Sequence, residues 1–198
     1  IIGSFVVIKN SLIFNNVHIQ DGVKIGVKGF GFIPIKNKNI RSPHIGKVIL
    51  EDNVEIGANC TIDRGSLTDT IIGKNTFLDN QVHVAHNVKI GKNCMIAGQV
   101  GFAGSSTIGN NVSIGGQAGV SGHLKIGNNV KIGKNCTIGH NSIIEKNVII
   151  GNNCSIGSNV IIRNSIINNN VYILDGCVIG KKGFGFFPDK KNNYRSDS

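Results

Sequence analysis

The chain has 198 residues, and 40% of them are hydrophobic against 16% that are charged, which is typical of one folded domain and excludes disorder over the whole chain. Its formal net charge of +10 would suit an acidic partner, but the lysines alternate with asparagines instead of clustering. With no Trp, 2 Tyr and no concentrated Lys/Arg run, the sequence argues against nucleic-acid binding.

The apolar and cysteine patterns limit the location of the protein. No apolar run approaches the roughly 18 residues of a membrane-spanning helix, and no charged and then apolar leader opens the chain. The five cysteines have no zinc-ligand spacing and make an odd total, so we expect reduced thiols in the cytoplasm. They are Cys60, Cys94, Cys136, Cys154 and Cys177.

The first part of the chain is interrupted by a candidate loop. The hydrophobic register is lost at about residues 26–47, which contain "GFGFIP". We expect these residues to leave the repetitive scaffold as a loop, and such loops are common binding sites. The glycine spacing does not match a dinucleotide fingerprint. A smaller break, a register shift of four, lies between Ile62 and Ile72.

A six-residue repeat dominates the rest of the chain. From Ile72 to Ile162 every sixth residue is aliphatic except Phe102, and a second, mostly small column follows each by four positions. A period of six fits neither an α-helix nor a simple alternating strand, but it fits a short strand followed by a tight turn. Three such units close a coil of 18 residues. The repeat therefore predicts an all-β fold, a parallel β-helix with both columns inside and with Asn and Gly at its corners.

A longer repeat relates the two ends of the chain. The sequence from Ile2 recurs from Ile156 at a constant offset of 154, so residues 1–42 reappear at 155–196. We therefore divide the chain into residues 1–130 and a continuing set of coils, residues 131–198, that repeats the beginning.

Two of the six histidines occupy related corners. His86 and His123 are 37 residues apart, which is two coils and one residue, so the repeat places them on the same edge about 10 Å apart. Asp79 lies seven residues before His86, and a nearby carboxylate can fix the tautomer of an imidazole that takes up a proton.

Several motifs in this order resemble one family. "GFGFIP", "VEIGANCTIDRGSLTDTIIG", "LDNQVHVAHNVKIG", "MIAGQVGFAGSSTIG" and "GGQAGVSGHLKIG" are similar to the UDP-3-O-acylglucosamine N-acyltransferases of lipid A synthesis, the LpxD family of hexapeptide-repeat proteins. The resemblance covers roughly residues 1–130. It implies a left-handed coil, a homotrimer with active sites between subunits, and transfer of a 3-hydroxyacyl group from acyl carrier protein to the 2-amine of a UDP-sugar.

The resemblance also assigns roles to residues. His86 in "AHN" takes the general-base position, Asp79 in "DNQ" would orient it, and Gly104 in "FAGS" would stabilise the oxyanion through its backbone N–H. It implies no permanently bound cofactor and no metal, because the donor is a thioester on the phosphopantetheine of the carrier. The residues expected to bind substrate or carrier are His123, Phe30, Phe32 and Asn80.

Other functions remain compatible with the residues. Another hexapeptide acyltransferase, including the O-acyltransferase of the same pathway, would share the repeat, although "TIDRG", "DNQ" and "AHN" together favour N-acyl transfer. A zinc enzyme of the carbonic anhydrase type would need His83, His86 and His123 to converge. An inactive structural or binding β-helix is the alternative without chemistry.

Overall fold

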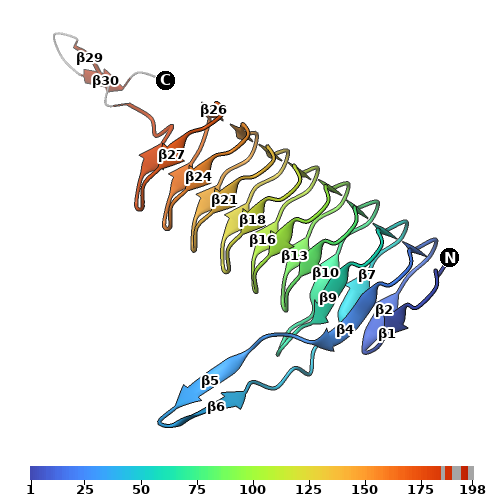
Figure 1. The fold of residues 1–198 in the computed structure, drawn as a ribbon. Coiled ribbons are helices and arrows are strands. Elements are labelled where there is room, and N and C mark those ends of the chain that lie inside the picture. Colours follow the sequence, from blue (N-terminus) through green and yellow to red (C-terminus); the bar gives the residue numbers. More distant parts are fainter. Residues whose placement is uncertain (184–185, 189–192, 196–198) are drawn as a thin grey trace.

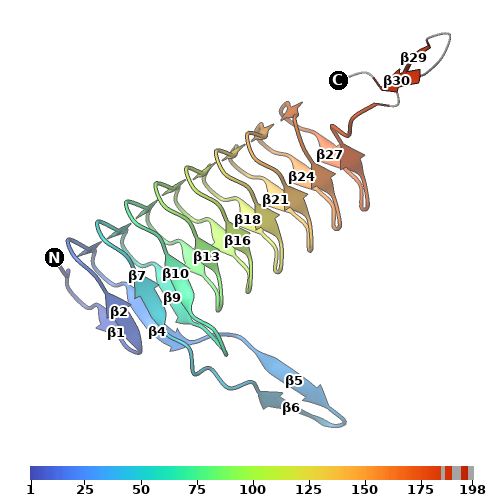
Figure 2. The same ribbon diagram turned by 180° about the vertical axis from the view of Figure 1, so that it is seen from behind.

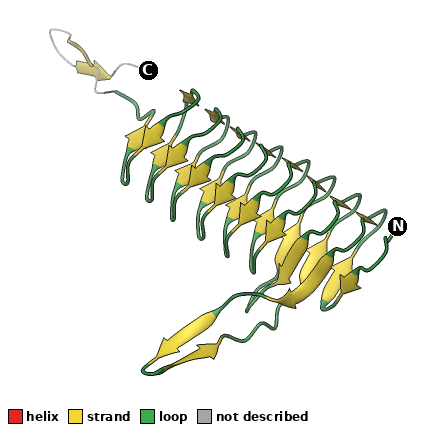
Figure 3. Ribbon diagram, viewed as in Figure 1, coloured by secondary structure: helices red, strands yellow, loops and turns green. Residues whose placement is uncertain are grey.

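The protein is a parallel solenoid of short strands. The computed structural model describes residues 1–183, 186–188 and 193–195, and every regular element in them is a strand (Figures 1 and 3). No helix in this part of the chain could cross a membrane. The strands stack into three parallel sheets, which we call the first, second and third faces of a triangular coil.

Each face takes one strand from each coil. The first face consists of β1 (Val7–Ile8), β4 (Lys24–Lys28), β9 (Thr61–Arg64), β12 (His83–Val84), β15 (Gly101–Phe102), β18 (Gly119–Val120), β21 (Thr137–Ile138), β24 (Ser155–Ile156) and β27 (Tyr172–Ile173). The second consists of β2 (Ser11–Ile13), β7 (Val48–Leu50), β10 (Thr70–Ile72), β13 (Lys89–Ile90), β16 (Thr107–Ile108), β19 (Lys125–Ile126), β22 (Ile143–Ile144), β25 (Ile161–Ile162) and β28 (Val178–Ile179). The third consists of β3 (His18–Ile19), β8 (Glu55–Ile56), β11 (Phe77–Leu78), β14 (Met95–Ile96), β17 (Ser113–Ile114), β20 (Lys131–Ile132), β23 (Ile149–Ile150) and β26 (Ile166–Ile167).

Parallel pairing follows the 18-residue coil. In the regular part each strand residue lies beside the residue 18 positions later, as Val84 lies beside Phe102. The parallel β-helix predicted from the six-residue repeat is therefore confirmed. Its left-handed sense stays a prediction from the resemblance.

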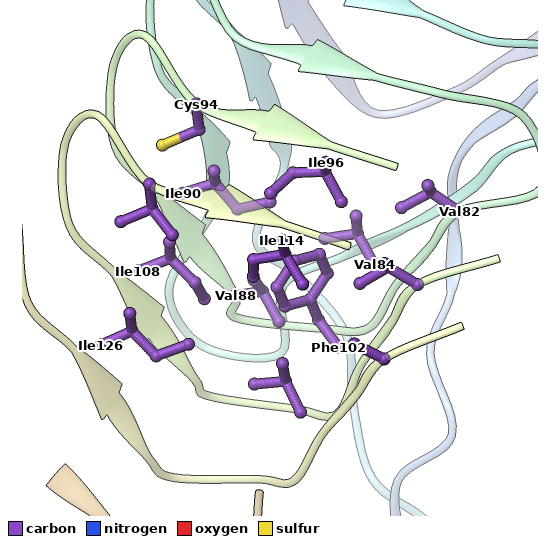
Figure 4. Packing of buried hydrophobic residues seen from close by; sticks show 14 of the residues in the cluster. Val82, Val84, Val88, Ile90, Cys94, Ile96, Phe102, Ile108, Ile114 and Ile126 are labelled. Carbon is purple, nitrogen blue, oxygen red and sulfur yellow. The ribbon is translucent and has the colours of Figure 1, made fainter. Parts of the chain in front are cut away.

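Both predicted columns fill the interior. Every residue of the aliphatic column from Ile72 to Ile162 is buried, and so is every residue of the small column from Thr76 to Val160. Figure 4 shows Val84, Phe102 and Ile114 pointing into the same space inside the coils. Cys60, Cys94, Cys136 and Cys154 lie in this interior as buried free thiols, and Cys177 is a partly buried one.

Asparagine and glycine shape the corners for different reasons. Asn93, Asn111 and Asn129 have φ near +57°, in the left-handed region that Asn tolerates better than most residues. Glycines such as Gly91 allow adjacent coils to lie close together, because a Cβ there would lie 2.5 Å from the carbonyl oxygen of Gly109 in the next coil. The expectation of unusual backbone angles is thus confirmed for asparagine, whereas most corner glycines have negative φ.

The predicted loop leaves the coil near one end of the solenoid. β4 continues to Lys28 through a bulge at Gly26, whose φ is +76°, so the chain departs at residue 29, not at residue 26. The departing segment contains an antiparallel hairpin, β5 (Phe32–Ile35) and β6 (Lys38–Arg41), which projects from the coils in both views (Figures 1 and 2). The chain returns at β7.

In the structure, the second copy of the repeat, which begins 154 residues after the first, is rotated by one face of the coil. β25, β26, β27 and β28 are the second copies of β1 to β4, but each lies one face further round the prism than its counterpart. A second hairpin, β29 (Phe186–Pro188) with β30 (Asn193–Arg195), repeats the register of β5 with β6. The side chains of the second "GFGF" loop lie outside the described residues. The division of the chain at residue 130 stays a prediction, and the strands after it continue the same three faces.

Candidate active site

His86 lies on the edge between the first and second faces. β12 ends at Val84, and the turn of Ala85, His86 and Asn87 carries the chain to the second face. Asn87 takes the left-handed conformation of that turn, with φ of +63°. The imidazole of His86 is half-buried beside the inserted loop, because a Cβ at Gly29 would lie 3.0 Å from the His86 Cβ.

Asn87 fixes the imidazole of His86. The Asn87 Oδ1 lies 2.9 Å from the His86 Nδ1. The Asn87 Nδ2 donates to the Thr68 carbonyl oxygen and to its Oγ1, while Oδ1 also accepts from the Ser66 backbone N–H and hydroxyl. Since the amide oxygen faces His86, we assign the proton to Nδ1, which leaves the lone pair on Nε2.

Gly104 stands one coil from His86 and touches its ring. A Cβ at Gly104 would lie 2.7 Å from the His86 Cε1 and 2.8 Å from Nε2, so a side chain at this position would displace the imidazole. The Gly104 backbone N–H has no acceptor among the described residues. Gly104 and the imidazole of His86 therefore border the same space.

That space is a largely apolar pocket of about 500 Å³ on the first face. Phe30 reaches it from the inserted loop, while His83 and Ser121 come from the coils. The lining residues are Phe30, Asp63, His83, Ala85, His86, Gly101, Phe102, Ala103, Gly104, Gly119, Val120, Ser121 and Thr137. Apolar walls with a few polar groups are typical of small-molecule sites.

The other predicted binding residues lie at different distances from this pocket. Phe32 is on the hairpin, 5.0 Å from the Phe30 ring and edge-on to it, and the Arg41 guanidinium lies 5.2 Å from the Phe32 centroid. His123 is on the same edge as His86, two coils further, but it does not line the pocket. His83 points outward from β12 and its Nδ1 lies 2.7 Å from the Thr61 hydroxyl.

Asp79 and Asn80 lie on another edge, between the third and first faces. Asp79 lines a separate pocket of about 660 Å³ on the third face, and its Oδ1 accepts from the Asn80 backbone N–H. The Asn80 Oδ1 accepts from the Ala58 N–H of the neighbouring coil. Within one chain Asp79 therefore does not orient His86, which corrects that expectation for a single chain; a contact between subunits stays a prediction.

Two buried residues near His86, His44 and Asp63, are not indicated by any motif or spacing in the sequence. The ring of His44 packs edge-on at 5.4 Å from that of His86; its Nδ1 lies 3.0 Å from the Ser42 carbonyl oxygen, and its buried Nε2 has no partner among the described residues. Asp63 is 7% exposed. Burial raises the pKa of its carboxyl group, while His83, His86, His44 and Arg41 oppose the increase.

The comparisons with known proteins agree with the coil. The model of the bacterial transferase hexapeptide, six repeats long, matches residues 69–104 and 129–164, and that of the hexapeptide repeat of succinyl-transferase matches residues 47–66. These three segments of the chain are thus similar to known hexapeptide repeats. This agreement rests on the same columns that fill the interior of the coils.

Curated relatives match part of the chain. Two proteins named UDP-3-O-acylglucosamine N-acyltransferase, from Rhizobium etli and Rhizobium rhizogenes, are 56% and 52% identical to it over 80 residues. Each match covers 40% of this chain but only 23% and 22% of the relatives' own length. Among solved structures, the UDP-N-acetylglucosamine O-acyltransferase of Moraxella catarrhalis is 29% identical, with a TM-score of 0.44 over 76% of this chain and 64% of that chain.

Proposed function

We propose that the pocket is the acyl-transfer site of a UDP-3-O-acylglucosamine N-acyltransferase. The reaction moves a 3-hydroxyacyl group from the phosphopantetheine thioester of acyl carrier protein to the 2-amine of the UDP-sugar. The observation that carries the proposal is the fixed imidazole of His86, which lines the same pocket as Gly104, whose backbone N–H has no acceptor among the described residues. The names of the curated relatives support the choice of reaction.

The chemistry requires a base but no protein nucleophile. His86 Nε2 takes a proton from the amine as its nitrogen attacks the thioester carbonyl carbon and the C–N bond forms. The Gly104 N–H stabilises the resulting oxyanion. When the oxyanion collapses, the C–S bond breaks and His86 returns the proton to the leaving thiolate. The buried cysteines agree with this scheme, because none of the four reaches the pocket.

The proposed reaction requires two partners and points to a location. The donor is acyl carrier protein, the acceptor is a UDP-sugar and the assembly is a homotrimer, in which the third-face pocket with Asp79 would meet a neighbouring subunit. His123, Asn80, Phe30 and Phe32 are proposed to contact the substrate or the carrier. Because the carrier protein works in the cytoplasm, the enzyme would work there too.

The test is acyl transfer from 3-hydroxyacyl carrier protein to UDP-3-O-acylglucosamine by the purified chain. His86→Ala is expected to lower kcat by about 10²–10⁴, the usual contribution of a general base. His140→Ala is the matched control, since His140 occupies the same corner position three coils further and is exposed. Equal activity of His86→Ala and the parent chain would refute the role of His86, and a parent chain without transfer would refute the function.

A further inference from the structure

Asp63 is a largely buried aspartate that lines the candidate pocket. It lies on β9 of the first face, and because side chains alternate along a strand it shares the outer surface with Thr61, where a buried charge is unusual. Its carboxylate makes no hydrogen bond or ion pair with any described residue. Burying such a group is costly unless something compensates it, and within the described residues the compensation comes only from the charges of His83, His86, His44 and Arg41 at a distance, without a direct bond.

The neighbouring arginines are engaged elsewhere. Arg64 donates to the carbonyl oxygens of Gly46 and Ile45. Arg41 donates to the Gly29 carbonyl oxygen and lies over the ring of Phe32. Among the described residues, therefore, neither arginine forms an ion pair with Asp63, so Asp63 does not belong to a structural ion pair.

Asp63 is also not the residue that orients His86. The Nδ1 of His86 is already bonded to Asn87, so no ring N–H on that side is left for a carboxylate. Both Asp63 and His86 line the same pocket, and the cationic side chains whose charge acts on the Asp63 carboxylate are His83, His86, His44 and Arg41. The carboxylate is thus open to a cationic group that enters this pocket.

We infer that Asp63 binds the amino group of the acceptor as an ammonium ion and thereby selects an amine over a hydroxyl. The inference rests on the proposed function for the identity of the acceptor. The bound ammonium releases one proton to solvent, and His86 then deprotonates the neutral amine as the C–N bond forms. A hydroxyl in the same position carries no positive charge and leaves the carboxylate uncompensated.

The test compares two acceptors that differ in one group. UDP-3-O-(3-hydroxyacyl)-glucosamine and the corresponding glucose derivative, with a 2-hydroxyl, are titrated calorimetrically into the parent chain, Asp63→Asn and Asp175→Asn at pH 7. Asp175→Asn removes the same charge from an exposed carboxylate that accepts one backbone hydrogen bond from Ser158, so it is the matched control.

The parent chain and the control are expected to bind the amine at least about 10-fold more tightly than the hydroxyl compound, as a charge-assisted hydrogen bond provides. In Asp63→Asn that preference disappears, while the affinity for the hydroxyl compound stays within about 2-fold. Equal affinities in the parent chain, an equal loss for both compounds in Asp63→Asn, or no binding of either compound would overturn the inference. An amine preference that depends on Asp63 in a chain without transfer activity would support the inference while refuting the proposed reaction.

Discussion

At the scale of single residues, the amide of Asn87 is the group on which the tautomer of His86 depends. Asn87→Ala removes the acceptor at Nδ1 and leaves Ser66 and Thr68 without their partner. We expect kcat to fall by about 10-fold or more while KM changes little, because the base loses its orientation and the pocket keeps its walls. Steady-state kinetics of acyl transfer give both values.

The control for this change occupies the equivalent corner. Asn141 has φ of +56°, and Asn141→Ala therefore imposes the same backbone cost three coils from His86. If Asn141→Ala lowered kcat as much as Asn87→Ala does, the effect would be one of folding and not of imidazole orientation.

The raised pKa of Asp63 predicts how its replacement changes stability with pH. Since burial favours the protonated carboxyl group in the folded state, Asp63 begins to cost stability as the pH rises above its unfolded pKa of 3.8, and the cost is complete once the pH exceeds its folded-state pKa. Asp63→Asn should therefore raise Tm at pH 7, by about 2–4 °C per kcal/mol recovered in a chain of this size. The gain should disappear as the pH falls toward 3.8.

Thermal unfolding followed by circular dichroism at several pH values measures this difference. A lower Tm for Asp63→Asn at pH 7 would show that the ionised carboxylate stabilises the fold, contrary to the prediction. A substitution of a pocket residue that raises the stability of the fold is typical of functional sites, whose residues are kept for activity although they destabilise the fold.

The sequence predicts the location of His86 and Gly104 better than that of their supporting residues. His86 and Gly104 have fixed places in the six-residue repeat, so their contact follows from the coil. Asp63 and His44 border a loop and a bulge, where the period is lost and no spacing indicates which side chains are covered. Asn87 looked like one of many corner asparagines, and its role depends on its contact with Thr68.

At the scale of elements, a ladder of asparagine amides runs along one corner of the coils. Each Nδ2 donates to the Oδ1 of the next coil over 2.9–3.2 Å, through Asn16, Asn53, Asn75, Asn93, Asn111, Asn129 and Asn147. Asn111→Ala interrupts two of these bonds and places Ala in the left-handed region. We expect the free energy of unfolding to fall by about 2 kcal/mol, measured with denaturant.

Asn111→Gly separates the two causes, because glycine adopts φ of +57° without a steric cost but cannot form the ladder. Its loss of stability should be about half of that of Asn111→Ala or less. Equal losses for Ala and Gly would assign the whole effect to the amides and would contradict the expected backbone contribution.

The repeat predicted the inserted loop only in part. The loss of the six-residue period indicated that residues near 26–47 leave the coil, but β4 continues to Lys28, and the hairpin of β5 and β6 was not predicted. The bulge at Gly26 explains the difference in start, since it lets the strand continue although the alternation has shifted. Nothing in the spacing of the loop residues required a hairpin.

At the scale of the whole molecule, the interior cysteines report on unfolding. Burial raises the pKa of the Cys60 thiol to about 11 and that of Cys94 and Cys136 above the ordinary value, so these thiols carry little thiolate at neutral pH. We expect a thiol reagent to label partly buried Cys177 in the folded chain, and the other four cysteines only at the rate of global unfolding.

Peptide mapping of the labelled protein after increasing times checks this order. If Cys94 or Cys136 were labelled as fast as Cys177, the coils around it would open independently of the rest. Labelling of the four at one common rate would show that the solenoid unfolds as a single cooperative unit.

The uniformity of the coils has a consequence for how the chain finds its alignment. A slip of one coil would move each interior residue onto a position of nearly the same size and polarity, so the regular part of the sequence is almost degenerate in register. The irregular features remove that degeneracy: the inserted hairpin, the register shift between Ile62 and Ile72 and the single aromatic side chain of Phe102 in the aliphatic column each fit one alignment. The inserted loop beside His86 thus also fixes the register in which the coils stack.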